Sequence, residues 1–332
     1  MKFLKFNSFD DLEIIESEIN GDFLVKVELC GICTGELMDW YVNSKAPYTP
    51  GHELVGYVIK VPENFDKFKI GDRVFVHHHA PCMSCDYCKR GEYTSCETWR
   101  NYKIYPGGFS EIVSVPKHIY ENDVLKIPDF VSSEDATLIE PLACSIKAIR
   151  KSNVNSLDNC AVIGLGFMGL LNAKLLKLFG ARKVVGFDFY ENRRKLALEW
   201  SNVDEVYHPD DFHFKEKFSL IIVGPPSILA IEFALKIADR ASRIILFAPT
   251  PPEDILKLNI NYIYFNEISI IPSYSAGPDD TKIALNLITS SIIKPSELIT
   301  HKFHFSEIKK AFEIAKKPEA IKVIINIGGG TW

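Results

Sequence analysis

The spacing of hydrophobic and polar positions divides the chain into regions with different periodicity. In the first region, which ends near Pro128, short apolar runs alternate with polar residues and are separated by proline and glycine. Alternation with a period of two is typical of half-buried β-strands, and the breakers mark turns between them. The pattern predicts an all-β, barrel-like domain whose strands include residues 23–29, 53–61, 73–76 and 109–115.

An alternation of strand and helix begins near Asp158. Helical stretches such as 169–179 and 193–200 separate short runs that are almost continuously apolar. This is the pattern of a parallel, doubly wound sheet, in which strands are covered on both faces. We expect six buried strands, at residues 160–163, 183–187, 205–207, 220–223, 244–247 and 268–271.

After Gly277 the chain returns to mixed elements. We expect a helix at 279–289, a strand at 299–303, a second helix at 306–315 and a last strand at 322–327. We expect these elements to fold back onto the first domain. The sequence therefore predicts an α/β protein with a discontinuous first domain, 1–143 and 278–332, and a second domain at 144–277.

Composition narrows the range of partners. The 332 residues are 47% hydrophobic and 24% charged, which is enough to bury the cores of two domains. The net charge of −5 and the lack of a basic run provide no positive field that would bind nucleic acid. The sequence has no apolar segment of about 18 residues and no signal-like start. We expect a cytoplasmic protein that binds small molecules and no membrane.

Four of the eight cysteines lie within fifteen residues, in the pattern C-x2-C-x2-C-x7-C. Gly91 allows the chain to turn back, so that four thiolates can surround one ion, as a closed structural zinc site requires. The alternatives are disulfides or four reduced core cysteines, but neighbouring cysteines pair poorly and a reducing compartment disfavours disulfides. We predict a structural zinc lobe at 82–96, with the ligands Cys82, Cys85, Cys88 and Cys96.

A glycine-rich turn begins the second domain. Gly164, Gly166 and Gly169 form G-x-G-x-x-G between an expected strand and an expected helix. Such a turn lets the backbone approach a pyrophosphate at the positive end of a helix. The alternative is a glycine-rich turn in a domain that binds no dinucleotide. We predict a dinucleotide site that includes this turn and the two residues at the start of its helix, Phe167 and Met168.

The next strand ends in Asp188, 19 residues after Gly169. A carboxylate at this place accepts hydrogen bonds from both ribose hydroxyls and repels a 2′-phosphate, which favours NAD. Arg193 and Arg194 follow nearby, and because arginine can bind a 2′-phosphate, NADP remains a possible cofactor.

Three further residues of the first domain have the chemistry of an open metal site. Cys33 and the pair His52-Glu53 lie beside turn glycines. A thiolate, an imidazole and a carboxylate leave room around zinc for water or substrate. By spacing alone, a single cysteine and a single histidine in a barrel are more often core residues than metal ligands.

The ordered set of motifs resembles the zinc-dependent, medium-chain alcohol dehydrogenases, and most closely their polyol, threonine and glucose dehydrogenase branch. The resemblance covers essentially the whole chain, through 299–301 and 322–325. The residues that carry it are Cys33, Gly51-His52-Glu53, the four-cysteine lobe, 107–111, Glu140-Pro141-Leu142-Ala143 and the G-x-G-x-x-G run.

The resemblance implies a GroES-like catalytic domain, a Rossmann domain, NAD and two zinc ions per chain, one catalytic and one structural. Cys33 and His52 would be catalytic zinc ligands, and Glu53 a ligand or a partner of the ligands. Glu140 would bind zinc directly or through its water. Cys144, one helical turn later, is an alternative ligand that we interpret as a core residue. A homodimer or homotetramer is also expected.

Two positions depart from the family pattern. The family usually has serine or threonine two residues after the catalytic cysteine, as a proton relay, and often histidine further on. Here these positions hold Gly35 and Met38. Thr34, Glu36 or a zinc-bound water are the candidate replacements.

The triplet His77-His78-His79 is another candidate for chemistry or metal binding. It follows an expected strand and precedes the cysteine lobe, where we expect polar, solvated residues.

We therefore predict a zinc-dependent oxidoreductase that transfers a hydride between an alcohol, polyol or sugar carbon and NAD or NADP. A zinc-independent carbonyl or enone reductase is the second hypothesis, but it would not require Cys33 and His52. A non-catalytic NAD-binding subunit is the third, because the relay residues are missing.

Overall fold

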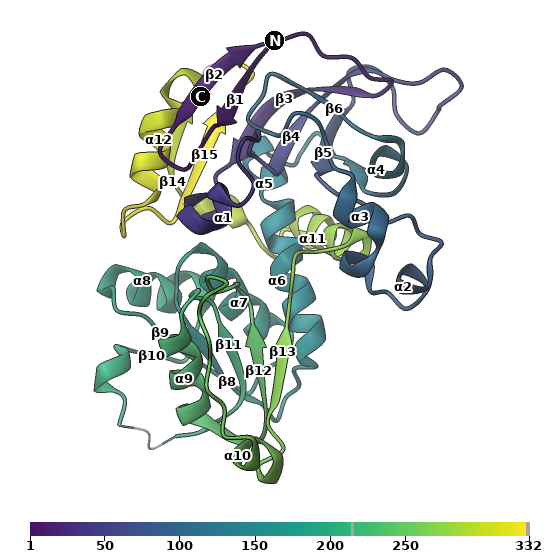
Figure 1. Ribbon diagram of the computed structural model, residues 1–332. Coiled ribbons are helices and arrows are strands. Elements are labelled where there is room, and N and C mark those ends of the chain that lie inside the picture. Colours follow the sequence, from purple (N-terminus) through teal and green to yellow (C-terminus); the bar gives the residue numbers. More distant parts are fainter. Residues whose placement is uncertain (214–215, 330–332) are drawn as a thin grey trace. The chain divides into compact units, whose positions relative to one another are not determined.

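The computed structural model describes residues 1–213 and 216–329, which form two compact units (Figure 1). Unit 1 comprises Met1–Ala143 and Ala276–Trp332, and unit 2 comprises Cys144–Ser275. The second boundary lies two residues before the one expected from the sequence. Residues 330–332 of the expected first domain lie outside the described residues.

Unit 1 is built on a seven-stranded sheet with the order β14-β15-β3-β4-β5-β7, in which β6 also pairs with β3. Most of its pairs are antiparallel, whereas β14 and β15 are parallel. A separate hairpin, β1–β2, was not expected from the sequence. The strands are β1 Lys2–Phe6, β2 Leu12–Glu16, β3 Leu24–Gly31, β4 Glu53–Lys60, β5 Arg73–His77, β6 Ile112–Ser114, β7 Val124–Lys126, β14 Ile299–His304 and β15 Lys322–Asn326.

The apolar run at 109–115 forms a shorter strand than expected. Its first residues leave the main sheet, because Phe109 accepts a hydrogen bond from the backbone of Leu4 and donates one to Pro50. Ile112–Ser114 forms the strand that pairs with β3, and Val27 of β3 also donates a hydrogen bond to the carbonyl oxygen of Glu111.

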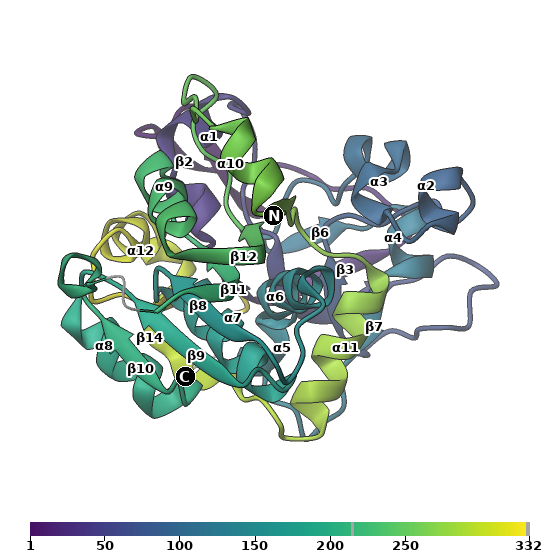
Figure 2. The same ribbon diagram turned by 90° about the horizontal axis from the view of Figure 1, so that it is seen from below.

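Short helices connect the strands of unit 1. Those of the cysteine lobe, α2 and α3, lie near each other in both views (Figures 1 and 2). The α-helices are α1 Asp39–Asn43, α2 Asp86–Lys89, α3 Glu97–Asn101, α4 Lys117–Asn122, α5 Ser133–Thr137, α11 Pro278–Thr289 and α12 Ile308–Ala315, and α6 Ile139–Ser152 runs from unit 1 into unit 2. The 3-10 helices are η1 Thr34–Leu37, η2 Tyr93–Ser95, η5 Pro295–Leu298 and η6 Phe305–Glu307.

Unit 2 contains a six-stranded, entirely parallel sheet with the order β10-β9-β8-β11-β12-β13. The expected doubly wound sheet is thereby confirmed, and β9 and β10 have the expected bounds. The strands are β8 Asn159–Ile163, β9 Lys183–Phe187, β10 Glu205–Tyr207, β11 Phe218–Val223, β12 Ala238–Leu246 and β13 Ser269–Pro272, and the helices are α7 Phe167–Leu178, α8 Glu191–Leu196, α9 Ile228–Ile237 and α10 Ile260–Phe265.

The strand order of unit 2 reverses between β8 and β11. Right-handed crossovers therefore carry α7 and α9 to opposite faces of the sheet. Ligands of such sheets bind outside the carboxyl ends of the strands at this reversal. β8 ends at Ile163, directly before the glycine-rich turn.

No helix in the described part of the chain combines the length and the apolar character needed to cross a lipid bilayer.

Candidate metal and dinucleotide sites

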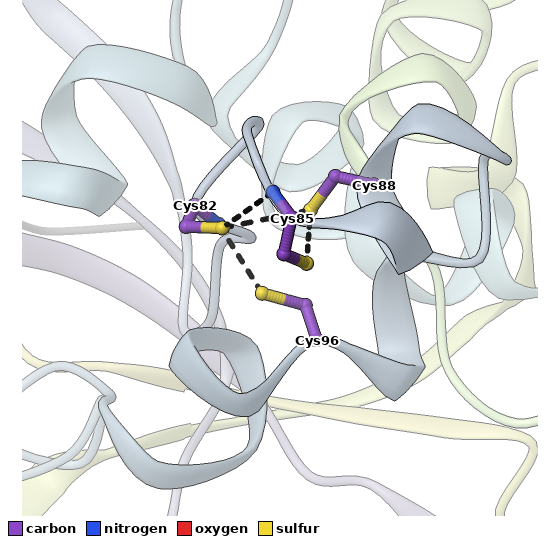
Figure 3. A group of neighbouring side chains, drawn as sticks. All are labelled: Cys82, Cys85, Cys88 and Cys96. Carbon is purple, nitrogen blue, oxygen red and sulfur yellow. Dashed lines mark hydrogen bonds between the residues drawn. The ribbon is translucent and has the colours of Figure 1, made fainter.

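The four cysteines of the lobe meet around one point. Cys88 lies in α2, and Cys96 precedes α3. The four side chains point toward a common centre (Figure 3), and their sulfur atoms lie within 4.8 Å of one another. No disulfide joins them, since all eight cysteines are free.

The spacing of these sulfur atoms fits a single zinc ion. The Sγ of Cys88 lies 3.9 Å from that of Cys82 and 3.5 Å from that of Cys85. Four sulfurs bound to zinc at about 2.3 Å in a tetrahedron would lie about 3.8 Å apart. A hydrogen bond from the Ser84 hydroxyl, with others from the backbone, lowers the pKa of Cys82 to about 5 and favours the thiolate that zinc requires.

The second ligand group lies at one edge of the sheet of unit 1, where the end of β3, the start of β4 and the end of β5 are neighbours. Gly31 at the end of β3 pairs with Glu53 at the start of β4, which pairs with His77 at the end of β5. Cys33 follows β3, and His52 directly precedes β4. This register brings ligand atoms of Cys33, His52 and Glu53 within 4.8 Å of one another.

Glu36 organises the two loops of this group. Its carboxylate accepts hydrogen bonds from the backbone of Cys33 at 3.0 Å and of Gly51 at 2.6 Å, and it lies 3.3 Å from Nδ1 of His52. Loss of hydration opposes a charged imidazole, but the negative charges of Cys33 and Glu36 outweigh it and raise the pKa of His52 well above 6.5. Glu36 is buried and already holds these partners, which favours a positioning role over a proton relay.

Glu53 forms a buried ion pair with Lys322 of β15. The Nζ of Lys322 lies 2.7 Å from one carboxylate oxygen of Glu53, contacts the other, and donates to the carbonyl oxygen of Ile32 at 2.9 Å. Burial raises the pKa of Glu53, and Lys322 opposes this rise. Lys322 therefore compensates the charge of the Glu53 carboxylate, which lies beside the other two ligand candidates, Cys33 and His52.

His77, His78 and Glu140 form another group of potential ligands, with one ligand atom of each within 4.8 Å of the others. The ring of His78 lies 4.9 Å, centroid to centroid, from that of His52. The expectation of a solvated triplet is wrong, because His77 is fully buried and His78 and His79 are half-buried. The reason is that β5 continues through His77 into the sheet register.

The other residues considered from the sequence have different positions. Cys144 is half-buried, not in the core, and belongs to none of the three ligand groups among the described residues. Thr34 is exposed on η1, and Gly35 faces the ring of Tyr41. The proton relay stays unassigned, and the role of Glu140 toward the Cys33 group stays a prediction.

Sequence reasoning missed Lys322, Asp123 and Thr281. A lysine within the apolar run 321–327 is a signal of a buried charge, and it could have indicated Lys322. Asp123 lies 2.5 Å from Nδ1 of His77, and its other oxygen accepts a hydrogen bond from the Thr281 hydroxyl at 2.6 Å. Nothing in the local sequence marks these two residues.

The glycine-rich turn of unit 2 has the geometry of a dinucleotide site. Gly164 has a φ of +83°, which favours glycine, and Gly166 caps the N-terminus of α7. A Cβ on Gly169 would overlap the carbonyl oxygen of Gly164. Phe167 is buried and Met168 is half-buried. The part of the turn available to a dinucleotide is therefore its backbone and not these two side chains.

Asp188 follows β9 and faces the same turn. Its carboxylate accepts hydrogen bonds from the backbone of Leu165 at 2.7 Å and of Tyr190 at 2.8 Å. Arg193 lies 4.0 Å from it, whereas Arg194 donates to the backbone oxygen of Asp188. The turn, the carboxylate and one arginine are therefore close together.

Comparisons with known proteins agree with this architecture. Residues 19–129 match the family model of the alcohol dehydrogenase GroES-like domain, which confirms the expected fold of the first domain. A sorbitol dehydrogenase of Halalkalibacterium halodurans is 29% identical over 91% of this chain and 90% of its own length. A probable D-xylulose reductase A of Aspergillus clavatus is 27% identical over 96% and 92%.

Solved structures extend the similarity to both units. A short chain alcohol dehydrogenase from E. coli, complexed with NADH, is 27% identical with a TM-score of 0.86 and covers 98% of this chain and 99% of its own. The L-idonate 5-dehydrogenase of Escherichia coli, at 20% identity, shares the fold with a TM-score of 0.86 and 98% coverage of both chains.

Proposed function

We propose that this chain is a zinc-dependent, medium-chain alcohol dehydrogenase of the polyol branch, and that it transfers a hydride between a hydroxyl-bearing carbon and NAD or NADP. The hydroxyl would belong to a polyol, a sugar or a simpler alcohol. Polyols are favoured, since the relatives named above include sorbitol and xylulose enzymes.

The observation that carries this proposal is the convergence of Cys33, His52 and Glu53 at the ends of neighbouring strands. A thiolate, an imidazole and a carboxylate are ligands that zinc accepts, and three of them leave a position open for substrate. Glu140 is the candidate exchangeable fourth ligand. Zinc bound there would act as a Lewis acid toward the substrate oxygen.

The protein's own residues prepare this site. Glu36 holds the Cys33 and Gly51 loops together and orients His52 through Nδ1, which leaves Nε2 for the metal. Lys322 compensates the charge of Glu53. The second zinc would be held by the four cysteines of the lobe, where it would stabilise the fold and take no part in the reaction.

The cofactor would bind at the turn Gly164–Gly169, with its pyrophosphate at the N-terminus of α7. NAD, or NADP, would be the hydride acceptor. We propose that Asp188 binds the adenosine ribose hydroxyls and favours NAD. Arg193, within 4.0 Å of that carboxylate, leaves a cation available for a 2′-phosphate.

We also propose a homo-oligomer located in the cytoplasm. Two features of unit 2 support self-association, namely the unpaired edge of β13 and the exposed apolar residues of α10. The eight free cysteines support a reducing compartment.

The test combines turnover, zinc content and NAD affinity in purified variants. Cys33→Ala and His52→Ala should each abolish alcohol oxidation and remove one zinc ion per chain, while NAD affinity stays nearly unchanged. The reason is that the glycine turn and Asp188 belong to the other unit. Glu140→Gln should weaken turnover more than metal retention.

Cys30→Ala is the matched control, because Cys30 is a buried cysteine near the same loop that belongs to no ligand group. It should retain the zinc content of the wild-type protein and most of the activity. Polyols, aldoses, amino alcohols and simple alcohols, each assayed with NAD and with NADP, would identify the substrate class. Full activity of Cys33→Ala would contradict the zinc-dependent mechanism and favour a zinc-free reductase.

A further inference from the structure

The imidazole of His77 is buried, and only one of its two nitrogen atoms has a hydrogen-bond partner among the described residues. Its Nδ1 lies 2.5 Å from the carboxylate of Asp123, which is itself fully buried and accepts the hydroxyl hydrogen of Thr281 at 2.6 Å. Its Nε2 is buried and has no hydrogen-bond partner among the described residues. Because an unpaired buried polar atom costs about 1–3 kcal/mol, this nitrogen requires a partner.

The arrangement of Asp123 and His77 indicates what that partner is. A histidine that ligates a metal usually donates its other ring N–H to a carboxylate, which orients the ring and makes the free nitrogen more basic. Asp123 occupies that place at Nδ1, and Thr281 orients Asp123 in turn. The lone pair of Nε2 is then available to a cation.

Two more ligand atoms lie beside His77. One atom each from His77, His78 and Glu140 lies within 4.8 Å of the others. Nδ1 of His78 is also buried without a hydrogen-bond partner among the described residues. Two imidazoles and a carboxylate suit zinc, iron, cobalt or manganese, and no thiolate belongs to the group.

This group lies beside Cys33, His52 and Glu53, since the rings of His52 and His78 are 4.9 Å apart. Glu140, the candidate fourth ligand of the Cys33 group, would bridge the two positions through its two carboxylate oxygens. Proteins hold two divalent ions in neighbouring positions when carboxylates are available to both, at separations of about 3.5–4 Å.

We propose that His77, His78 and Glu140 form a second divalent-metal position beside that of Cys33, His52 and Glu53. Asp123 is its positioning residue, acting through His77. The inference goes beyond the proposed reaction, for which the Cys33 group provides the metal. It would stand even if the protein had no dehydrogenase activity, because it concerns metal binding alone.

The experiment counts metal ions in metal-free protein that has been saturated with Co²⁺ and dialysed. Wild-type protein should bind three ions per chain, one for each ligand group. His78→Ala should bind two, and His79→Ala, the matched control in the same triplet, should bind three. Circular dichroism and thermal unfolding would verify that each variant is folded.

Absorption spectra identify which ion is lost. The ion lost in His78→Ala should leave the thiolate-to-cobalt charge-transfer band unchanged, whereas the ion lost in Cys33→Ala should reduce it. Asp123→Asn should retain all ligands yet lower the affinity for the third ion by roughly 10- to 100-fold. This variant keeps the proposal testable if His78→Ala does not fold.

The proposal would be overturned by two ions in saturated wild-type protein, or by three in folded His78→Ala. It would equally be overturned if His78→Ala lost thiolate-to-cobalt absorption, because the histidines would then serve the ion of Cys33. Turnover is not part of these measurements, so failure of the proposed function would leave their outcome interpretable.

Discussion

The ion pair between Glu53 and Lys322 places two opposite charges in the interior of unit 1, with both side chains at most 3% exposed. Removing ions from water costs several kcal/mol for each, and their attraction compensates this cost only when the geometry is good. Here Lys322 contacts both carboxylate oxygens and the carbonyl of Ile32. Each charge therefore depends on the other.

We predict that Lys322→Met lowers the free energy of unfolding by about 3–5 kcal/mol, because it leaves the Glu53 carboxylate buried without its partner. The double variant Glu53→Gln with Lys322→Met should recover much of the loss. Chemical denaturation of the two variants and of wild-type protein would measure this. Equal stability of wild type and Lys322→Met would show that the pair contributes nothing.

Asp158 connects several elements of unit 2 just before β8. Its carboxylate contacts the guanidinium of Arg243 in β12 and accepts hydrogen bonds from the hydroxyl of Ser219 at 2.8 Å and the backbone of Asn155 at 2.9 Å. Burial opposes ionisation, but these hydrogen bonds and the arginine charge outweigh it and lower the pKa of Asp158. The folded state therefore favours the ionised form.

A group whose pKa is lower in the folded state stabilises the fold above its unfolded pKa, near 3.8, and this contribution is lost as pH falls through the folded value. We predict that Asp158→Asn lowers stability by about 1–3 kcal/mol at neutral pH. The difference from wild type should shrink below about pH 4. Thermal unfolding of both proteins across this pH range tests the prediction. Asp239→Asn, at an exposed position, is the control and should change neither the stability nor its dependence on pH.

The helices of the cysteine lobe, α2 and α3, have only four and five residues, and its small apolar cluster is formed around Trp99 and the cysteines themselves. The proposed ion should therefore contribute strongly to its stability. We predict that Cys96→Ser removes one zinc per chain and lowers the melting temperature by roughly 5 °C or more. A folded fraction should keep the other zinc. Cys160→Ser, which changes a buried cysteine of unit 2, should keep the zinc content of the wild-type protein. Unchanged zinc content in Cys96→Ser would mean that the lobe binds no metal.

Across the whole molecule, large exposed apolar side chains gather on one element of unit 2. In α10, Ile260, Tyr264 and Phe265 are 67%, 73% and 72% exposed, and the helix leads into β13 at the edge of the sheet. An open strand edge beside apolar side chains is a surface suited to pairing with another chain.

We predict that Tyr264→Asp combined with Phe265→Asp reduces the molecular mass in solution to that of a smaller assembly. Two charges on an apolar contact would remain buried and unpaired there. Light scattering coupled to size exclusion would measure the mass. Leu229→Asp, at a position 76% exposed on α9, is the control and should leave it unchanged. A wild-type protein that is monomeric at micromolar concentration would refute the proposed oligomer.

Much of the fold could be predicted because hydrophobic periodicity is local. Strands such as β9 and β10 have the expected bounds, since short apolar runs between helices have few alternatives. The hairpin β1–β2 was missed because β2 has only half-buried and exposed positions, and the buried positions of β1 do not alternate regularly. Strand β12 starts six residues before the expected run, where its first residues are mostly exposed.

The sequence by itself determined the features whose residues lie close together along the chain. The four cysteines occur within fifteen residues, and the glycine turn within six, so local backbone geometry brings each set together. Only the tertiary structure decided that Lys322 meets Glu53 across 269 positions and that Thr281 meets Asp123 across 158. It also decided that His77 is buried against Asp123. Such contacts depend on strand register and helix packing, which no local pattern of residue types specifies.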